Sequence, residues 1–244
     1  MYKRQVQRWA TSSGRDVSPA WSPDHTRVAF VSDRGGVNHV FVASADGSSP
    51  RDLTPGDAVC GAPAWSPDGA WLAYVQWEMT GAQANIRVMR ADGSESRALT
   101  ANTGINGGPV WPKGGRIYFA SNRERGGTSF DLYVMDESGE NPHKVAPIAG
   151  LIGRPALSPN GRMLTYAAMV GPETPGLFVL DTRGGVPRPI GPENSAEPMW
   201  VPDGSGLLFT SWKDGNAEVY SMDAGGGSVR RLTTNPAADG GANW

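Results

Sequence analysis

The chain has 244 residues, of which 39% are hydrophobic, with 33 glycines, 20 prolines and a formal net charge of −2. This composition favours many short strands joined by turns over long helices, and the balanced charge argues against nucleic acid or an anionic membrane surface as a partner. No apolar stretch approaches the roughly 18 residues needed to span a bilayer, so we expect no direct membrane insertion.

Both ends of the sequence are abrupt. Residues 1–5 read Met-Tyr-Lys-Arg-Gln and resemble the translation of an adapter used in sequencing libraries. We therefore expect residues 1–5 to be an artefact and the domain to occupy residues 6–244 as a truncated piece of a longer protein. On this interpretation the lack of a signal peptide carries no information about location.

One position recurs along the whole chain. It is tryptophan five times and leucine once, at steps of 44, 46, 46, 43 and 44 residues: Trp21, Trp65, Trp111, Leu157, Trp200 and Trp244. A period in the forties with strand-like content is typical of a β-propeller. We interpret each recurrence as the start of the first strand of a four-stranded blade, and Trp65, Trp111 and Trp200 as packing between blades.

The remaining strands of each unit follow in order. After the recurrent position comes a turn, in which Pro supplies a fixed φ and Asp-Gly or Asn-Gly a positive φ. It lies at 65–69, 158–161 and 202–204, and at 21–24, where His25 follows the Asp in place of Gly. Alternating apolar residues predict the second strands at 28–31, 72–75, 117–120, 164–167 and 207–209. The third strands are predicted at 40–42, 86–89, 132–135, 177–180 and 219–222, and the fourth at 51–54, 97–100, 144–145, 189–190 and 231–233.

The fold class is therefore all-β. A single outer strand is predicted at residues 6–11, before the first complete unit, and Trp244 opens a further one. We expect a β-propeller of four-stranded antiparallel blades, with five complete blades plus parts of a sixth, because radial stacking buries both faces of such sheets.

These motifs resemble the TolB-type (WD-like, PD40) β-propeller repeat. The resemblance rests on Trp-Ser-Pro-Asp-Gly at 65–69, Ser-Asp-Arg-Gly-Gly at 32–36, Ser-Asn-Arg at 121–123 and the recurring Arg-x-Leu-Thr, and it covers about residues 6–244. The best-known member of this family is a six-bladed periplasmic propeller that binds a peptidoglycan-associated lipoprotein in the Tol–Pal envelope system. The resemblance thus implies a non-catalytic module that binds a protein or peptide in the periplasm or elsewhere outside the cytoplasm.

Two other contexts of such propellers stay open. Similar propellers cover the catalytic domain of prolyl-oligopeptidase-type serine peptidases, and others follow membrane-anchored kinase or transcription-regulator domains. The sequence itself holds no Gly-x-Ser-x-Gly nucleophile motif, and its histidines, His25, His39 and His143, lack metal-ligand spacing and are expected on the surface. Cys60 is expected in a loop as an incidental thiol. We expect no catalytic residue, no cofactor and no metal ion in this chain.

The candidate partner site lies where the repeats differ most. The loops that enter the first strands and the loops that join the second and third strands share one face of a propeller, here called the loop face. Trp77 and Trp212 fall there, out of phase with the recurrent tryptophans, and aromatic side chains beside charges are typical anchors for protein partners. The alternative is that both tryptophans only cover apolar blade edges. The candidate partner-binding residues are Trp77, Glu78, Arg123, Arg125, Phe130, Arg154, Glu197, Trp212 and Lys213.

Overall fold

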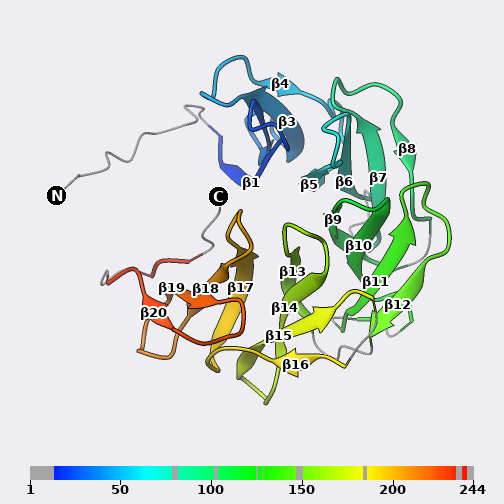
Figure 1. Cartoon of the computed structure of the whole chain (residues 1–244). Coiled ribbons are helices and arrows are strands. Elements are labelled where there is room, and N and C mark those ends of the chain that lie inside the picture. Colours follow the sequence, from blue (N-terminus) through cyan, green and yellow to red (C-terminus); the bar gives the residue numbers. More distant parts are fainter. Residues whose placement is uncertain are drawn as a thin grey trace.

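The strands form five blades around a common centre. The structure is a computed structural model that describes residues 14–78, 82–101, 104–124, 126–127, 129–146, 151–183, 186–234 and 238–240. The 20 strands of these residues form five four-stranded antiparallel sheets, which Figure 1 shows as an arc of propeller blades with blades 1 and 5 at its two ends. This confirms the all-β propeller and its five complete blades. The parts assigned to a sixth blade, residues 6–11 and Trp244, lie outside the described residues, as do residues 1–5.

Within each blade, the strands run in chain order from the centre to the rim. Blade 1 consists of β1 (Asp16–Trp21), β2 (Arg27–Ser32), β3 (His39–Ser44) and β4 (Arg51–Asp52). Blade 2 consists of β5 (Cys60–Trp65), β6 (Trp71–Trp77), β7 (Ala84–Arg90) and β8 (Arg97–Ala98). Blade 3 consists of β9 (Asn106–Val110), β10 (Arg116–Ser121), β11 (Asp131–Asp136) and β12 (His143–Ala146). Blade 4 consists of β13 (Leu151–Leu157), β14 (Met163–Met169), β15 (Pro175–Asp181) and β16 (Arg188–Pro189). Blade 5 consists of β17 (Ser195–Trp200), β18 (Gly206–Ser211), β19 (Glu218–Asp223) and β20 (Arg230–Arg231).

The recurrent position ends the first strand rather than starting it, so this part of the prediction was wrong. Trp21, Trp65 and Trp200 are the last residues of β1, β5 and β17. The residues before them are rich in glycine and proline, which usually excludes a strand interior. Proline is tolerated here because each innermost strand pairs on one side only, with the second strand of its own blade. Its missing N–H therefore faces the channel rather than a ladder partner.

A bulge interrupts every innermost strand. At each bulge one residue has a left-handed backbone: Ser18, Ala62, Gly108, Gly153 and Glu197, with φ between 49° and 66°. In blades 1, 2, 3 and 5 the bulge places two residues opposite one on the second strand. In blade 4, three residues (153–155) lie opposite Tyr166, because Ile152 pairs with Ala167 and Ala156 with Thr165. Arg154 is therefore an additional residue at the centre of the propeller.

The hydrophobic core lies between consecutive blades. Between blades 1 and 2, for example, Val40 and Leu53 of blade 1 pack with Trp65 and Leu72 of blade 2. The side chains of Trp65 and Trp200 are 6% and 7% exposed. The partly buried Trp111 packs against the hydrophobic cluster between blades 2 and 3. This confirms the packing role expected for the recurrent tryptophans at these positions, each worth roughly 2–3 kcal/mol of burial.

The turn after the recurrent position is built by its serine and its acidic or amide residue. In blade 1, the Ser22 hydroxyl donates to Asp24 Oδ1 at 2.6 Å and accepts from the Arg27 N–H at 2.9 Å. The same bonds recur in blades 2 and 4. The residue that follows has a left-handed backbone, with φ of 56° at His25 and 69° at Gly69. Blade 1 thus places a histidine where glycine is the favoured residue.

Candidate partner-binding site

A groove of about 610 Å³ opens on the loop face between blades 1 and 2. It lies beside the start of β1, the loop before β5 and the end of β6. Its apolar lining comes from Val17, Val31, Ala58, Val59, Ala62 and Trp77. We call it the Trp77 groove. Two of the candidate residues, Trp77 and Glu78, meet in it.

Trp77 forms one wall of this groove. It is the last residue of β6, it is half-buried, and its backbone N–H donates to the Val59 carbonyl at 2.9 Å. Its indole lies against Gly61, where an added Cβ would stand 3.4 Å from the ring. The strand and the close packing on a glycine together fix the ring, so the wall exists before any partner arrives.

Two carboxylates stand at the edge of the Trp77 groove. Asp57 and Glu78 both line it and both are exposed. Within the described part of the chain, neither side chain has a hydrogen-bond or ion-pair partner. The exposed Val59, with 39% of its surface accessible, lies between them in the sequence. An apolar wall and two unpaired negative charges therefore face the same space.

Cys60 also lines the groove, but not as a loop residue. It is the first residue of β5 and only 2% exposed, which corrects the expected loop position. Burial raises the pKa of its thiol. A protonated, buried thiol is a poor nucleophile, so Cys60 contributes packing to the groove.

Arg123 and Lys213 lie against the aromatic side chains of their own blades. The Arg123 guanidinium carbon is 4.6 Å from the Tyr133 ring centre, and its Nε and Nη2 donate to Ser121 Oγ and Asn106 Oδ1, each at 3.0 Å. Lys213 places its Nζ 4.9 Å from the Tyr220 ring centre. Arg34 makes the same contacts in blade 1. Sequence reasoning missed this clamp of a cation on an aromatic pair, although the repeated Ser-x-Arg was visible.

The remaining candidate residues are distributed around the ring. Phe130 is half-buried against the cluster between blades 3 and 4, and Trp212 is 41% exposed on blade 5. Arg154 and Glu197 lie within β13 and β17 rather than in loops, which corrects their expected placement. Arg125 lies outside the described residues. The eight candidate residues that the structure describes thus do not form one cluster.

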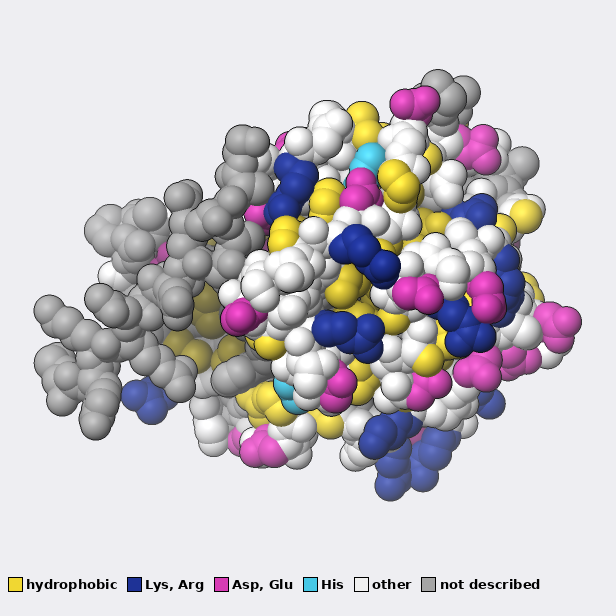
Figure 2. All heavy atoms as spheres, turned by 90° about the horizontal axis from the view of Figure 1, so that it is seen from above, with side chains coloured by type: hydrophobic (Ala, Val, Ile, Leu, Met, Phe, Trp, Pro, Cys, Tyr) yellow, Lys and Arg dark blue, Asp and Glu magenta, His cyan; other side chains and the backbone are white. Residues whose placement is uncertain are grey.

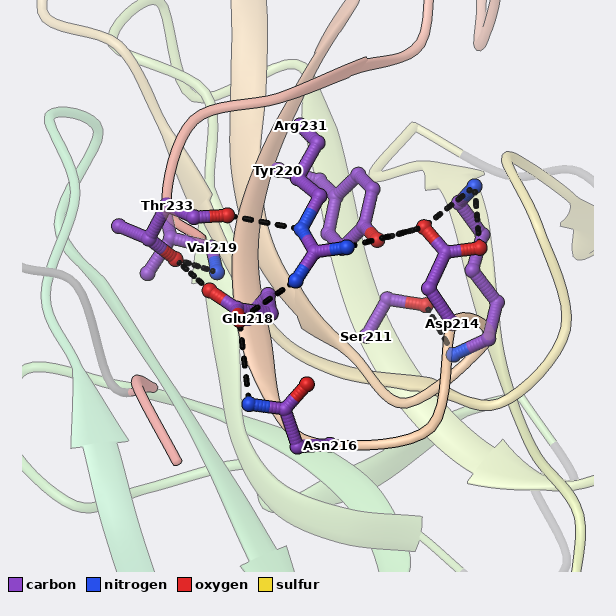
Figure 3. A network of polar contacts seen from close by, with 9 residues as sticks. Ser211, Asp214, Asn216, Glu218, Val219, Tyr220, Arg231 and Thr233 are labelled. Atoms are coloured by element: carbon purple, nitrogen blue, oxygen red, sulfur yellow. Dashed lines mark hydrogen bonds and ion pairs between the residues drawn. The ribbon is translucent and has the colours of Figure 1, made fainter. Parts of the chain in front are cut away.

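Buried charges join the third and fourth strands within the blades. In blade 5, Glu218 has no exposed surface; Arg231 Nη2 lies 2.6 Å from its Oε1, Asn216 Nδ2 donates to it at 3.1 Å, and the Thr233 hydroxyl donates to its second oxygen. Figure 3 shows these side chains converging on Glu218. The Thr233 hydroxyl and the Arg231 guanidinium hold the pKa of Glu218 below its ordinary value. Glu218 is therefore a structural carboxylate.

A polar side-chain contact recurs at the equivalent position of other blades, between the third strand and the fourth strand or the residues just after it, and we call it the blade clasp. It joins Asp131 to Lys144 in blade 3, at 3.0 Å, and Asn85 to Thr100 in blade 2, at 2.9 Å. In blade 1, His39 Nδ1 lies 2.7 Å from Asp52 Oδ2 and is 5% exposed, so this histidine is not the surface residue that we expected. Blade 4 has Gly176 at this position and thus no side chain to form a clasp.

Charged side chains of both signs are interspersed on the outer side of the ring. On the side seen in Figure 2, basic and acidic residues lie between apolar and neutral ones. Within the described residues, no three His, Cys, Asp or Glu side chains are gathered in a way that could hold a metal ion.

None of the residues that the structure describes belongs to a helix with the length and apolarity required to cross a membrane.

Comparison with known proteins places the chain among propellers. Residues 132–244 match the family model described as "TolB beta propeller domain". A 62-residue stretch is 39% identical to "Uncharacterized peptidase YuxL" of Bacillus subtilis, covering 25% of this chain and 9% of that protein. A 79-residue stretch is 27% identical to "Tol-Pal system protein TolB" of Desulfosudis oleivorans, covering 32% of this chain and 18% of that protein. The matched stretches span less than a fifth of either relative.

A solved structure gives the same architecture. TolB from Acinetobacter baumannii superposes with a TM-score of 0.77 over 92% of this chain and 56% of that chain, at 19% identity. At this identity the likeness shows the fold alone. The family model, the local matches and the five blades together support a β-propeller of the TolB type.

Proposed function

We propose that this propeller is a non-catalytic module that binds an extended protein or peptide segment in the Trp77 groove. The recognised segment carries an apolar side chain next to a lysine or arginine. The observation that carries this proposal is the groove itself, where the Trp77 wall and the carboxylates of Asp57 and Glu78 face one space.

The two kinds of group have different tasks. Aromatic side chains in a partly enclosed pocket are the usual energetic anchors of an interface, and their removal typically costs 2 kcal/mol or more of binding, about a thirtyfold change in affinity. Unpaired carboxylates at the edge favour basic partners and speed their association, in a way that salt weakens. The indole would thus hold the apolar side chain while the carboxylates select its basic neighbour.

The test is a selection of twelve-residue peptides displayed on phage against the purified chain, with the Trp77→Ala variant for counter-selection. We expect enriched peptides to share an apolar residue beside a basic one, and to lose roughly thirtyfold in affinity on Trp77→Ala. Trp212→Ala is the matched control, because Trp212 directly follows the second strand of blade 5, where Trp77 ends that of blade 2. Enriched peptides that bind a folded Trp77→Ala variant as well as wild type would contradict the site.

The cellular setting belongs to the same proposal. The similarity to Tol-Pal system proteins TolB supports a role in a Tol–Pal-like system of the cell envelope, with the propeller in the periplasm or otherwise outside the cytoplasm. A fusion of the full-length gene product to alkaline phosphatase, which is active only after export, tests the location. An inactive fusion that accumulates in the cytoplasm would contradict it.

A second candidate function follows from the match to a peptidase. The 39% identity with YuxL favours a propeller that covers the catalytic domain of a serine peptidase. In that case the full-length protein would carry a Gly-x-Ser-x-Gly serine that reacts with a fluorophosphonate probe. Labelling of the full-length protein supports this candidate, and its absence from a folded protein removes it.

A further inference from the structure

A second cavity lies at the other end of the central channel. Its volume is about 720 Å³, and all five innermost strands contribute to it. The turns after those strands, at residues 21–23, 65–67 and 111–113, form its edge. The cavity therefore opens on the face opposite the loop face, and we call it the turn-face cavity. Figure 1 shows the innermost strands β1, β5, β9, β13 and β17 around this centre.

The wall of the turn-face cavity is apolar and aromatic. Trp21, Trp65 and Trp111 line it, together with five prolines of the innermost strands and of the turns that follow them: Pro19, Pro23, Pro67, Pro155 and Pro198. Proline has no N–H, so the wall offers few backbone donors. Trp111 Nε1 is buried without a hydrogen-bond partner in the described part of the chain. Hydrogen bonds to an acceptor group of a ligand would therefore have to come from side chains.

Arg154 supplies such donors. Its Nη2 donates to the Pro63 carbonyl at 3.1 Å and to the Pro109 carbonyl at 2.8 Å, which fixes the guanidinium between blades 2, 3 and 4. A guanidinium has five N–H donors, and the three on Nε and Nη1 have no acceptor among the described residues. The residue retains exposed surface, but its guanidinium lies among the innermost strands. Desolvation there lowers the pKa of Arg154 to about 10, which leaves it charged at neutral pH.

The other charges of the cavity favour an anion. Lys113 lies at its edge, is exposed, and makes no ion pair within the described residues. Glu197 is the one acidic side chain that lines it, and its carboxylate accepts a hydrogen bond from Thr210 Oγ1 at 2.7 Å. The cavity is thus lined by two cations and one carboxylate, and the carboxylate already has a hydrogen-bond partner within the protein. Moreover, Arg154 is the residue by which blade 4 departs from the bulge of the other four blades.

We propose that the turn-face cavity binds an organic carboxylate with an apolar or aromatic body. The carboxylate accepts hydrogen bonds from the remaining N–H donors of Arg154, on Nε or Nη1, and the body packs on Trp21, Trp65 and Trp111. The guanidinium is already oriented by two carbonyls, so little side-chain entropy is lost on binding. The site is separate from the Trp77 groove and does not depend on the function proposed for that groove.

Two sources share this chemistry, a free aromatic acid and the C-terminal carboxylate of a peptide. Calorimetric titration of the purified chain with phenylacetate and with acetyl-Gly-Phe bearing a free carboxylate distinguishes them. The controls are 2-phenylethanol and acetyl-Gly-Phe amide, which keep the apolar body and remove the charge. We expect one or both acids to bind and both neutral analogues to bind at least about tenfold more weakly. Binding of the acid peptide alone would identify a chain terminus, and binding of phenylacetate alone a small molecule.

Variants locate the carboxylate. We expect Arg154→Gln to weaken binding of the acid at least about tenfold and Arg154→Lys to retain part of it. Arg188→Ala removes the same charge from the exposed β16 and should change nothing. Because Arg154→Gln also removes hydrogen bonds to two carbonyls, circular dichroism must show that it is folded. In the wild-type protein, the indole N–H resonance of Trp111, assigned with Trp111→Phe, should shift on titration. Failure of both acids to bind, or equal binding by acid and neutral analogue, would overturn the proposal.

Discussion

Arg231 Nη2 lies 2.6 Å from Glu218 Oε1, so an arginine on the outermost strand of blade 5 pairs with a carboxylate that has no exposed surface. The strand that carries Arg231 is only two residues long. Such a short strand forms few ladder hydrogen bonds, and the blade clasp adds a side-chain contact at its end. Four of the five blades contain a clasp of this kind, although its chemistry changes from blade to blade.

The clasp of blade 5 gives the first prediction. Arg231→Met leaves Glu218 buried without its cation, which is strongly destabilising, and we expect the thermal midpoint to fall by roughly 5–10 °C. Arg230→Met changes the exposed neighbour on the same strand and is the matched control. The double variant Glu218→Gln/Arg231→Met should recover part of the loss. Equal midpoints for Arg231→Met and Arg230→Met in differential scanning calorimetry would contradict this role.

The turn of blade 1 gives a prediction about acid stability. The Ser22 hydroxyl and the Thr26 N–H and hydroxyl bond to Asp24 and lower its pKa from 3.8 to about 2. Since the folded-state pKa lies below the unfolded value, this carboxylate stabilises the fold above about pH 4, and the contribution is lost as the pH falls toward 2. Asp24→Asn retains the turn, because blade 4 has Asn160 at this place. The difference in thermal midpoint between wild type and Asp24→Asn should shrink between pH 5 and pH 2. A constant difference would exclude the linkage.

The left-handed residue of the same turn gives a third prediction. Gly69 has a φ of 69°, and Gly69→Ala should cost about 1–2 kcal/mol because a Cβ is strained in this region. His25 occupies the equivalent place with a φ of 56°. His25→Gly relieves that strain but adds entropy to the unfolded chain, so we expect a gain of less than about 1 kcal/mol. Urea unfolding measures both changes, and a loss of stability on His25→Gly would contradict the argument.

Trp212 gives a prediction that separates surface from core. It is 41% exposed, whereas the recurrent Trp200 of the same blade is 7% exposed. Trp212→Ala should leave the thermal midpoint within about 2 °C of wild type, whereas Trp200→Ala should cost about 3–5 kcal/mol. A large loss on Trp212→Ala would show that this tryptophan covers a blade edge rather than forming a free surface.

Cys60 gives a chemical prediction. Burial raises the pKa of its thiol, and the side chain is 2% exposed. We expect iodoacetamide to leave the native protein unmodified at pH 7.5 and to alkylate it fully in denaturant. Mass spectrometry reads both results, and rapid alkylation of the native protein would show that the wall of the Trp77 groove opens.

The period of the repeat was enough to predict the fold, since the apolar second and third strands alternate clearly and lie close to β2 and β3 and their counterparts in the other blades. The innermost strands were misplaced because proline and glycine obscure them, and only an edge position makes those residues acceptable. The additional residue Arg154 could not be found from spacing. The step from Trp111 to Leu157 equals the step from Trp65 to Trp111, because the loops between the blades also vary in length.

The site was predictable in part. Trp77 and Glu78 were identified from an aromatic residue beside a charge on the loop face, and the structure places them in one groove with Asp57. The environments of Arg123 and Lys213 were not predictable from their own neighbourhood, since the aromatic rings they contact belong to other strands. Whether a charge lies free or against a ring depends on cross-strand register, which the repeat length does not specify.

Blade 4 differs from the other blades in two places, in its innermost strand and in its third strand. Its innermost strand carries the inserted Arg154, and its third strand has Gly176 where the other blades place a side chain of the clasp. Both departures, the additional residue of the innermost strand and the missing clasp, thus fall in the same sheet, β13–β14–β15–β16.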